Sequence, residues 1–452
     1  MKVRWAKYPI SLPDFLQTGA CMPNDCRDFT MKTFYLLIII WLLFPFAGIH
    51  AQTFRAGAAM RVITPEKLIP ISGGMGTPVM PEAKQGELTV RALVLEKEES
   101  RVAIVGIDNL GWPAYLGNRS RKLIRGISPE CVLIGATHTH SAPDAYAFPD
   151  ENGNTGADLE YLDWCVVQIA DAVNEAVAKL EPASLKTAVG EAKGKIAYNY
   201  YAPELYDRRC GVIQTIAASG ENKGKVLATL VNYATHPEIL GTKRKLMSPD
   251  LCGPLYDRIE SKTGGLALFM NSAQGGMVTA DNRRENGAEA NDWDECIRIG
   301  NLLADEALRI VEPATVQPNP DLCCVSKEIK LPVESAEMQY VLKNSPLAKK
   351  SGTVDFRVVS TRINLLNIGE AQVLTIPGEA LPNIGYYLKR NMKSDQAFLF
   401  GLTNDAFGYI LSKEDYNSFD RYRYISRTSL GEMTAEIFEK EAFKLIEENP
   451  GP

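Results

Sequence analysis

Residues 131–143 read CVLIGATHTHSAP, an apolar run that passes directly into a polar segment with two histidines. The apolar part favours a buried strand. Residues i and i+2 of an extended segment project to the same side, so His138 and His140 can both face one pocket. Beyond residue 51 the chain has one further histidine, His236, within residues 233–238 (YATHPE). Because histidine is the commonest metal ligand and the usual proton carrier near neutral pH, this distribution indicates a metal or acid–base site.

The rest of the chain alternates short apolar runs with segments of helical period, which predicts an α/β fold with mixed sheets flanked by helices. The predicted strands are 88–97, 102–107, 131–136, 226–234, 266–270, 355–366, 371–376 and 397–401. The predicted helices are 157–180, 250–262, 289–311, 380–391 and 428–446. In the first of these helices, apolar residues recur every three or four positions and form one stripe that is expected to face the core.

Five of the predicted strands end in a polar turn. These turns are 137–140, 235–236, 271–276, 377–379 and 402–404. In open α/β sheets the ligand crevice lies outside the carboxyl ends of the strands. We therefore expect the polar turns to meet in one shared site at the C-terminal ends of the strands.

The N-terminal segment is expected to be separate from the fold. Residues 31–51 combine one positive charge, a short apolar core and Ala51 at a suitable cleavage point, which is typical of a secretory signal peptide. The alternative for this segment is an N-terminal anchor helix, although its apolar run is short and interrupted by Pro45. Residues 1–30 are expected to be an upstream extension from a mis-assigned start. Residues 52–452 are expected to form one domain. The predicted signal peptide implies a secreted or periplasmic location.

Charge and cysteines narrow the class of protein further. The whole chain has a net charge of −6, and residues 1–51 contribute +2, so the remainder carries about −8. This balance argues against nucleic acid as a partner and against adhesion to anionic lipid, and no membrane span is expected after cleavage. None of the seven remaining cysteines lies in a CxxC pair, so a thiolate zinc site is not expected. One disulfide is compatible with this number, and its partners stay open.

The histidines suit a zinc site. Two or three imidazoles, a carboxylate and an open position describe catalytic zinc, whereas a histidine pair can also simply hydrogen-bond to backbone. Glu379 ends an apolar strand and is a candidate carboxylate, although an acid at a helix start is favoured by the helix dipole as well. Thr279 is a candidate hydroxyl at the site or an ordinary turn residue. The sequence contains no G-x-S-x-G elbow and no phosphate-binding or dinucleotide-binding glycine pattern.

Several short motifs follow one another along this chain in an order and spacing that match a known protein family. They are Ile63-Thr64-Pro65, Gly73-Gly74-Met75-Gly76, the HTHSAP segment 138–143, His236, Ser248-Pro249-Asp250, Pro377-Gly378-Glu379 and Gly401-Leu402-Thr403-Asn404 with Tyr409, Glu414 and Tyr416. Together they resemble the neutral/alkaline (non-lysosomal) ceramidase family, zinc-dependent amidases that split ceramide into sphingosine and fatty acid. The resemblance covers most of residues 54–446, the N-terminal catalytic domain, without the family's C-terminal β-sandwich.

The resemblance implies a set of site residues. Zinc would be held by His138, His236, Glu379 and Tyr409, while His140 would activate water or stabilise the transition state. Thr279 takes the place of a serine to which the family assigns a catalytic role, in residues 276–281 (GMVTAD). That segment also lacks the family's Asp and Pro. The family's N-R-S segment corresponds to residues 199–201 (NYY), which lack its arginine, although Arg208 and Arg209 are near in sequence.

These observations predict an exported Zn²⁺-dependent hydrolase that cleaves an N-acyl bond by zinc-activated water, with a small-molecule or lipid substrate such as a ceramide-like N-acyl compound. His140 is the predicted general base or oxyanion stabiliser. Thr279 is predicted to contact the substrate or to act as a nucleophile. One alternative is a zinc esterase or deacylase acting on a polar acylated substrate such as a glycan. Another is a zinc-bearing binding protein in which the altered loop around Thr279 has abolished catalysis.

Overall fold

The computed structural model describes residues 53–352 and 355–451. The predicted signal peptide and upstream extension lie outside the described residues. The larger sheet has eight strands, and neighbours in this order are hydrogen-bonded: β13 (Leu266–Asn271), β11 (Val226–Tyr233), β10 (Arg209–Ala217), β8 (Glu181–Glu191), β1 (Arg55–Val62), β4 (Thr89–Lys97), β5 (Ser100–Ile107) and β6 (Val132–Ala136). The β11–β13 and β5–β6 pairs are parallel, and the other pairs are antiparallel.

A second sheet packs against the first. Its strands are β15 (Leu322–Pro332), β16 (Val358–Ile368), β17 (Ala371–Thr375) and β19 (Gln396–Phe400), with β17 and β19 parallel. Four two-stranded ribbons complete the strands: β2 (Ile71–Ser72) with β7 (Ala142–Pro143), β3 (Ala83–Lys84) with β12 (Leu246–Met247), β9 (Ala197–Asn199) with β14 (Val278–Ala280), and β18 (Glu379–Ala380) with β20 (Tyr409–Ile410).

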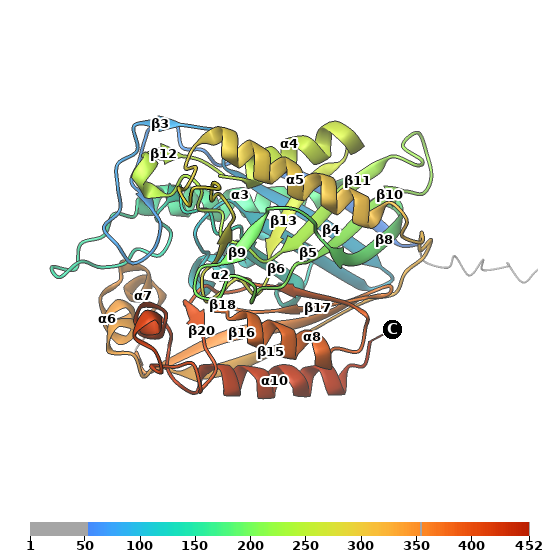
Figure 1. Ribbon diagram of the computed structural model, residues 1–452. Helices are drawn as coiled ribbons and strands as arrows, with labels where there is room; N and C mark the ends of the chain where they lie inside the picture. The colour runs from blue at the N-terminus through green and yellow to red at the C-terminus, as the bar shows by residue number, and fades with distance from the viewer. Residues whose placement is uncertain (1–52, 353–354, 452) are drawn as a thin grey trace, which may run out of the picture. The chain divides into compact units, whose positions relative to one another are not determined.

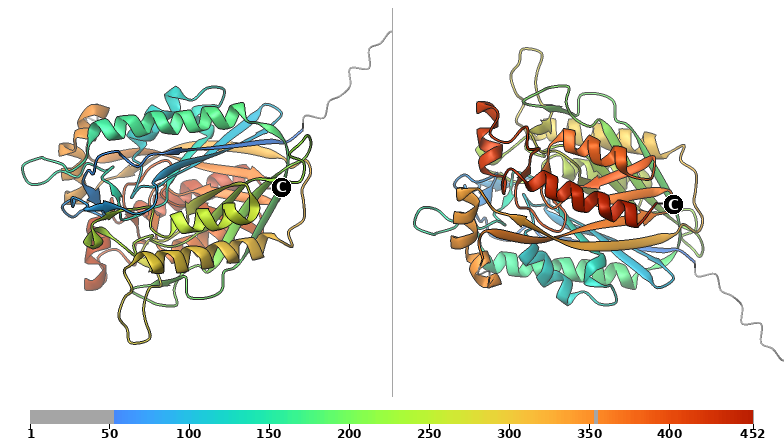
Figure 2. Two further views of the ribbon diagram at one scale, coloured as in Figure 1. Left: turned by 90° about the horizontal axis from the view of Figure 1, so that it is seen from above. Right: turned by 90° about the horizontal axis from the view of Figure 1, so that it is seen from below.

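The helices are α2 (Ala114–Leu123), α3 (Leu159–Ala178), α4 (Cys252–Thr263), α5 (Trp293–Val311), α6 (Ala336–Asn344), α7 (Pro346–Ser351), α8 (Pro382–Asn391), α9 (Arg423–Arg427) and α10 (Thr434–Glu448), with short 3₁₀ turns at Pro129–Cys131, Thr242–Arg244 and Asp420–Tyr422. The helices α3, α4, α5, α8 and α10 cover the outer faces of the two sheets. In Figure 1, α4 and α5 lie above the sheets and α8 and α10 below them. Figure 2 shows, from above, α3 on one side and α4 and α5 on the other with the blue N-terminal strands between them, and, from below, α8 and α10 in front. The layers therefore run helix, sheet, sheet, helix, as expected for mixed sheets flanked by helices.

The apolar core follows these layers. One buried cluster lies between the two sheets and includes Leu93, Ile213, Leu268, Phe398 and Phe400. Three further clusters lie between a sheet and its helices: α3 on β1, β4 and β5, α4 and α5 on β10 and β11, and α8 and α10 on the second sheet. Burial on both faces explains why the central strands are continuous apolar runs.

The helix α3 illustrates why the predicted elements form. Asp158 caps its first turn by accepting hydrogen bonds from the backbone N–H groups of Glu160 and Tyr161. The predicted apolar stripe is buried against the first sheet. At Gly57 a Cβ atom would lie 2.2 Å from the carbonyl oxygen of Ala176, so glycine allows β1 and α3 to approach closely.

All of the predicted strands and helices are present, with end shifts of a few residues. Four long strands, β1, β8, β10 and β15, were not predicted. In β15, eight of the eleven residues are exposed or half-buried, so its sequence LCCVSKEIKLP has a weak apolar pattern. Cys131, Cys165, Cys210, Cys252, Cys296, Cys323 and Cys324 are free thiols. Within residues 53–352 and 355–451, no helix combines the length and hydropathy of a membrane span.

Replacing Glu439 of α10 with glutamine should stabilise the fold at pH 8. Burial, together with nearby Glu436 and Glu414, raises the pKa of Glu439 to about 7. The folded-state pKa lies above the ordinary value, so ionisation of Glu439 lowers the free energy of unfolding as pH rises from about 4.5 to 7. We expect Glu439→Gln to raise that free energy by on the order of 1 kcal/mol at pH 8, because solvent screens this partly exposed site.

Urea unfolding at pH 8 and pH 5 measures this effect, which should shrink at the lower pH. The matched control on the same helix is Glu441→Gln. Glu441 pairs with Lys327 and has a lowered pKa, so its loss should be neutral or slightly destabilising at pH 8. Equal unfolding free energies for wild type and Glu439→Gln at pH 8 would contradict the prediction.

Candidate metal centre

The three histidines beyond residue 51 converge in space. The ring centroids of His138 and His236 are 4.6 Å apart, and those of His138 and His140 are 4.7 Å apart. One nitrogen from each of the three rings lies within 4.8 Å of the others, which makes them a group able to hold a metal ion. His138 and His236 are buried, with side chains 4% and 0% exposed. The predicted meeting of these strand-end residues is thus present in the fold.

One asparagine holds the two strand ends together. Asn271 is the last residue of β13, and its Nδ2 donates to the carbonyl oxygens of Thr137, at 3.1 Å, and of Thr235, at 2.7 Å. These two residues directly precede His138 and His236. A single side-chain amide therefore fixes the spacing between the segments that carry both histidines. Nothing in the sequence assigns this role to Asn271, because its partners are distant along the chain.

Backbone carbonyls orient the rings of His138 and His236. Nδ1 of His138 is hydrogen-bonded to the carbonyl of Leu110, and Nδ1 of His236 lies 2.7 Å from that of Val278. His138 also has a φ of +73°, which is uncommon outside glycine, and its N–H donates to Asn109 O at 2.9 Å. With Nδ1 protonated, each ring presents the lone pair of Nε2 to the centre. This arrangement is typical of metal-binding histidines.

Glu379 completes a set of three converging ligand atoms. Its Oε2 lies 3.1 Å from Nε2 of His236 and 3.4 Å from Nε2 of His138. Burial alone would raise the pKa of Glu379, but the two imidazoles hold it below its ordinary value, so the carboxyl group is ionised. At Gly275 a Cβ atom would lie 2.2 Å from the carbonyl oxygen of Glu379, so only glycine lets this loop pass so close. A carboxylate and two imidazole nitrogens are ligands that suit Zn²⁺.

Tyr409 lies beside Glu379. The two residues are paired in the parallel ribbon β18–β20, so their side chains project to the same face. The Tyr409 hydroxyl lies 3.5 Å from Sδ of Met277, and burial raises the pKa of Tyr409 well above its ordinary value. The phenol is therefore neutral without a cation close by. Its role as a fourth ligand stays a prediction.

His140 differs from the other two histidines in its partners. Its Nδ1 lies 3.4 Å from Oε2 of Glu238, and its Nε2 is buried without a hydrogen-bond partner among the described residues. Burial and repulsion by His138 and His236 lower the pKa of His140 well below its ordinary value. A neutral imidazole with a free lone pair suits either a proton acceptor or a third imidazole ligand.

Thr279 lies in β14, close to the backbone of His236. Its neighbours Val278 and Ala280 belong to the apolar core under α4 and α5, and Thr279 itself is half-buried. The Thr279 side chain is not among those that line the cavity described next. Its predicted catalytic role stays a prediction, whereas the carbonyl of Val278 has a clear contact with His236.

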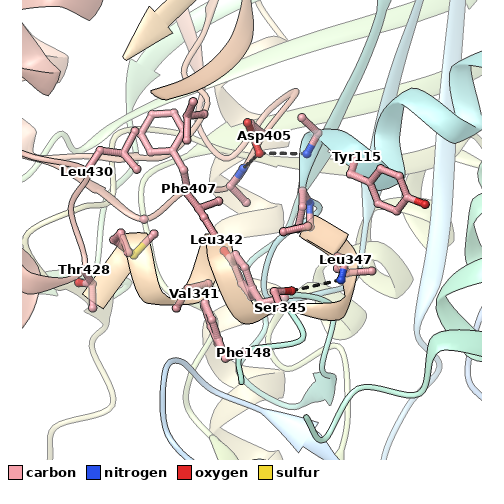
Figure 3. Close-up of a pocket in the computed structure, with 18 of the residues that line it drawn as sticks. Tyr115, Phe148, Val341, Leu342, Ser345, Leu347, Asp405, Phe407, Thr428 and Leu430 are labelled. Carbon is pink, nitrogen blue, oxygen red and sulfur yellow. Dashed lines mark hydrogen bonds between the residues drawn. The ribbon is translucent and has the colours of Figure 1, made fainter. Parts of the chain in front are cut away.

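A cavity of about 590 Å³ begins at the centre and continues between α2, α6 and α7. Figure 3 shows the part lined by Tyr115, Leu342 and Leu347. His138, His140, Glu379 and Tyr409 line one part of it. The remaining wall is mostly apolar and includes Met338, Val341, Leu342, Leu347, Phe148, Phe407, Val359 and Leu430. Burying an alkyl chain against such a wall is favourable by about 0.8 kcal/mol per methylene. The centre therefore communicates with a space suited to an alkyl chain.

The fold has relatives among solved structures. The neutral ceramidase from Pseudomonas aeruginosa matches 87% of this chain and 74% of its own, with a TM-score of 0.71 and 17% sequence identity. The chain has the neutral ceramidase fold. A structure described as a ceramidase complexed with C2 has a TM-score of 0.70 and 17% identity, and the match covers 87% of this chain and 75% of that one. No family model and no curated protein matches the sequence. The likeness to these structures is therefore one of fold, at 17% sequence identity.

Proposed function

We propose that this chain is a zinc-dependent hydrolase that cleaves the amide bond of an N-acyl substrate of ceramide type. The observation that carries the proposal is the continuity between the cluster of His138, His236 and Glu379 and an apolar cavity. The ceramidase-like fold supports the same proposal. In this proposal Zn²⁺ is held by His138, His236, Glu379 and Tyr409.

The proposed chemistry uses groups that already face the cavity. When bound, zinc would act as a Lewis acid that polarises the scissile carbonyl and lowers the pKa of water. Nε2 of His140 takes the proton of the attacking water, because this nitrogen is buried and lacks another partner. The same nitrogen returns the proton to the departing amine, so one imidazole serves both halves of the reaction. The acyl chain lies in the apolar part of the cavity.

Two features favour the proposal over its alternatives. The mostly apolar cavity wall favours a substrate with an alkyl chain over a wholly polar acylated glycan. The unpartnered Nε2 of His140 favours catalysis over simple metal-dependent binding, since a binding protein has no need of a buried free base. Esters of long-chain acids remain compatible with the same site.

Hydrolysis of a matched substrate set tests the proposal. The set is N-hexadecanoyl sphingosine, N-hexadecanoyl ethanolamine, p-nitrophenyl octanoate and an O-acetylated xylan fragment, each assayed with and without a zinc chelator. We expect turnover of the N-hexadecanoyl amides that disappears on chelation and returns with added Zn²⁺. Full activity of exhaustively demetallated protein, or turnover of the acetylated glycan alone, would reject the proposal.

Filling the cavity with a larger side chain should change the preferred acyl length. Ala348 of α7 lines the cavity, so Ala348→Phe takes up space that the distal methylenes of a long chain would use. We expect kcat/KM for an N-hexadecanoyl substrate to fall on the order of tenfold, since each lost methylene costs about 0.8 kcal/mol. Values for the N-butanoyl substrate should hardly change. Ala336→Phe, on the exposed first turn of α6 and outside this cavity, is the matched control.

We also propose that the protein is exported, on the basis of residues 31–51 alone. N-terminal sequencing of the protein secreted by an expressing bacterial host tests this. The expected mature end is Gln52. Retention of residues 31–51 in a membrane fraction would support the anchor alternative.

A further inference from the structure

Glu238 is an acidic residue at the centre that the proposed mechanism does not use. Its Oε2 lies 3.4 Å from Nδ1 of His140, and its side chain is 23% exposed. Among the described residues its carboxylate forms no ion pair with a lysine or an arginine. A surface carboxylate without such a partner normally points into water, whereas this one lies next to Nδ1 of the His140 ring.

The loop that carries Glu238 is held on both sides. The carbonyl oxygen of Pro237 accepts a hydrogen bond from the backbone N–H of His140 at 3.0 Å. Further along, the N–H of Leu240 donates to Oδ2 of the buried Asp250 at 2.9 Å. Glu238 lies between these two anchors, so the backbone brings its carboxylate to His140 without depending on the ion pair itself.

Each Nδ1 of the three histidines has an oxygen atom within 3.4 Å. The Nδ1 atoms of His138 and His236 are hydrogen-bonded to the carbonyl oxygens of Leu110 and Val278, and Nδ1 of His140 has the carboxylate of Glu238 as its ion-pair partner. A neutral imidazole carries one N–H, and the acceptor that faces one ring nitrogen decides where this proton resides. An acceptor at Nδ1 leaves Nε2 with its lone pair. In His140 this Nε2 is the buried atom without a partner.

We propose that Glu238 is a positioning residue that accepts the Nδ1–H of His140 and thereby holds the ring with a bare Nε2 facing the centre. The inference rests on the proposed function only for its effect on catalysis. The tautomer of His140 follows from Glu238 when Nε2 of His140 is not bound to metal, because a metal on Nε2 would itself keep the proton on Nδ1. Without Glu238 the ring is free to adopt the Nε2–H form, which presents a donor where the chemistry needs an acceptor.

The test uses the zinc-loaded protein and two variants of Glu238. Glu238→Leu removes the acceptor at similar size, and Glu238→Gln keeps a carbonyl oxygen that can accept the same proton. Nitrogen NMR of protein labelled with ¹⁵N-histidine reports the tautomer directly, and the mature chain has only three histidines to assign. We expect the Nδ1–H form of His140 in wild type and Glu238→Gln, and its loss in Glu238→Leu.

Kinetics on the N-hexadecanoyl substrate give a second readout. Glu238→Leu should lower kcat about 10- to 100-fold, the usual effect of removing a partner of this kind, with KM and zinc content unchanged. Glu238→Gln should recover most of that loss. Glu175→Leu removes an ion-paired glutamate from α3, which does not line the cavity, and should leave kcat unchanged.

The outcomes separate the two proposals. An unchanged His140 tautomer in Glu238→Leu overturns the positioning role, and so does a fall in kcat that Glu238→Gln fails to recover. If no form of the protein hydrolyses any substrate, the proposed function fails, while the NMR comparison still decides the role of Glu238. A parallel loss of zinc and of thermal stability in Glu238→Leu would overturn the positioning role in favour of a structural one.

Discussion

Replacing His236 with alanine is expected to leave the protein folded but without its metal and without hydrolytic activity. His236 is fully buried and its Nε2 lies 3.1 Å from Oε2 of Glu379, so no other side chain can take its place without moving a strand end. We expect zinc content to fall from about one ion per chain to a small fraction. Activity should fall by at least about a thousandfold, because Lewis-acid stabilisation contributes several kcal/mol to such reactions.

Metal analysis after gel filtration, together with the substrate assay, measures both effects. Circular dichroism and a melting curve show whether the variant is folded, since His236 also contacts the carbonyl of Val278. His236→Gln, which fills more of the space, separates lost packing from a lost ligand. A folded His236→Ala protein that retains one zinc ion and normal turnover would reject the proposed centre.

His140→Ala should lose turnover, as His236→Ala does, but should retain the metal. Nε2 of His140 is the buried nitrogen without a partner, and in the proposed mechanism it carries the proton. General acid–base catalysis by a positioned side chain contributes about 10²- to 10⁴-fold, so kcat should fall within that range. KM should change little, because the acyl chain contacts the other wall of the cavity.

The same variant distinguishes two ligand sets that the geometry allows. One set is His138, His236, Glu379 and Tyr409, and the other includes all three imidazoles, whose nitrogens lie within 4.8 Å. Loss of zinc from His140→Ala would make His140 a ligand and would require another base. Glu379→Gln is the companion variant, because it should lose zinc only if the carboxylate belongs to the ligand set.

The sequence predicted much of the fold because the relevant signals are local. The apolar stripe of α3 and the apolar run of β6 each lie within twenty residues and reflect a simple periodicity. Strands such as β8 and β15 escaped prediction because half of their residues are exposed or small. They are strands because they pair with β10 and β16, although their own composition gives only a weak strand signal.

The candidate site was predictable to a similar extent. The scarcity of histidine is by itself enough to single out His138, His140 and His236. The carboxylate could not be chosen on chemistry alone, and the family resemblance was needed to prefer Glu379. The roles of Asn271 and Glu238 could not be predicted, since an asparagine at a strand end or a glutamate in a loop has no local signature. Their importance depends on partners, such as Thr137 and His140, that lie about a hundred or more residues away.

By itself, the sequence singled out the histidines of the candidate site and the segments that form strands ending in polar turns, because residue type and periodicity are local properties. Only the tertiary structure decided that β6 and β11, separated by five strands in the same sheet, bring their ends together. That closure depends on Asn271 and on the packing of the second sheet, both of which are long-range contacts. The apolar cavity also depends on tertiary packing, because its wall combines residues of α2, α6 and α7 with residues of the centre that lie far apart in the sequence.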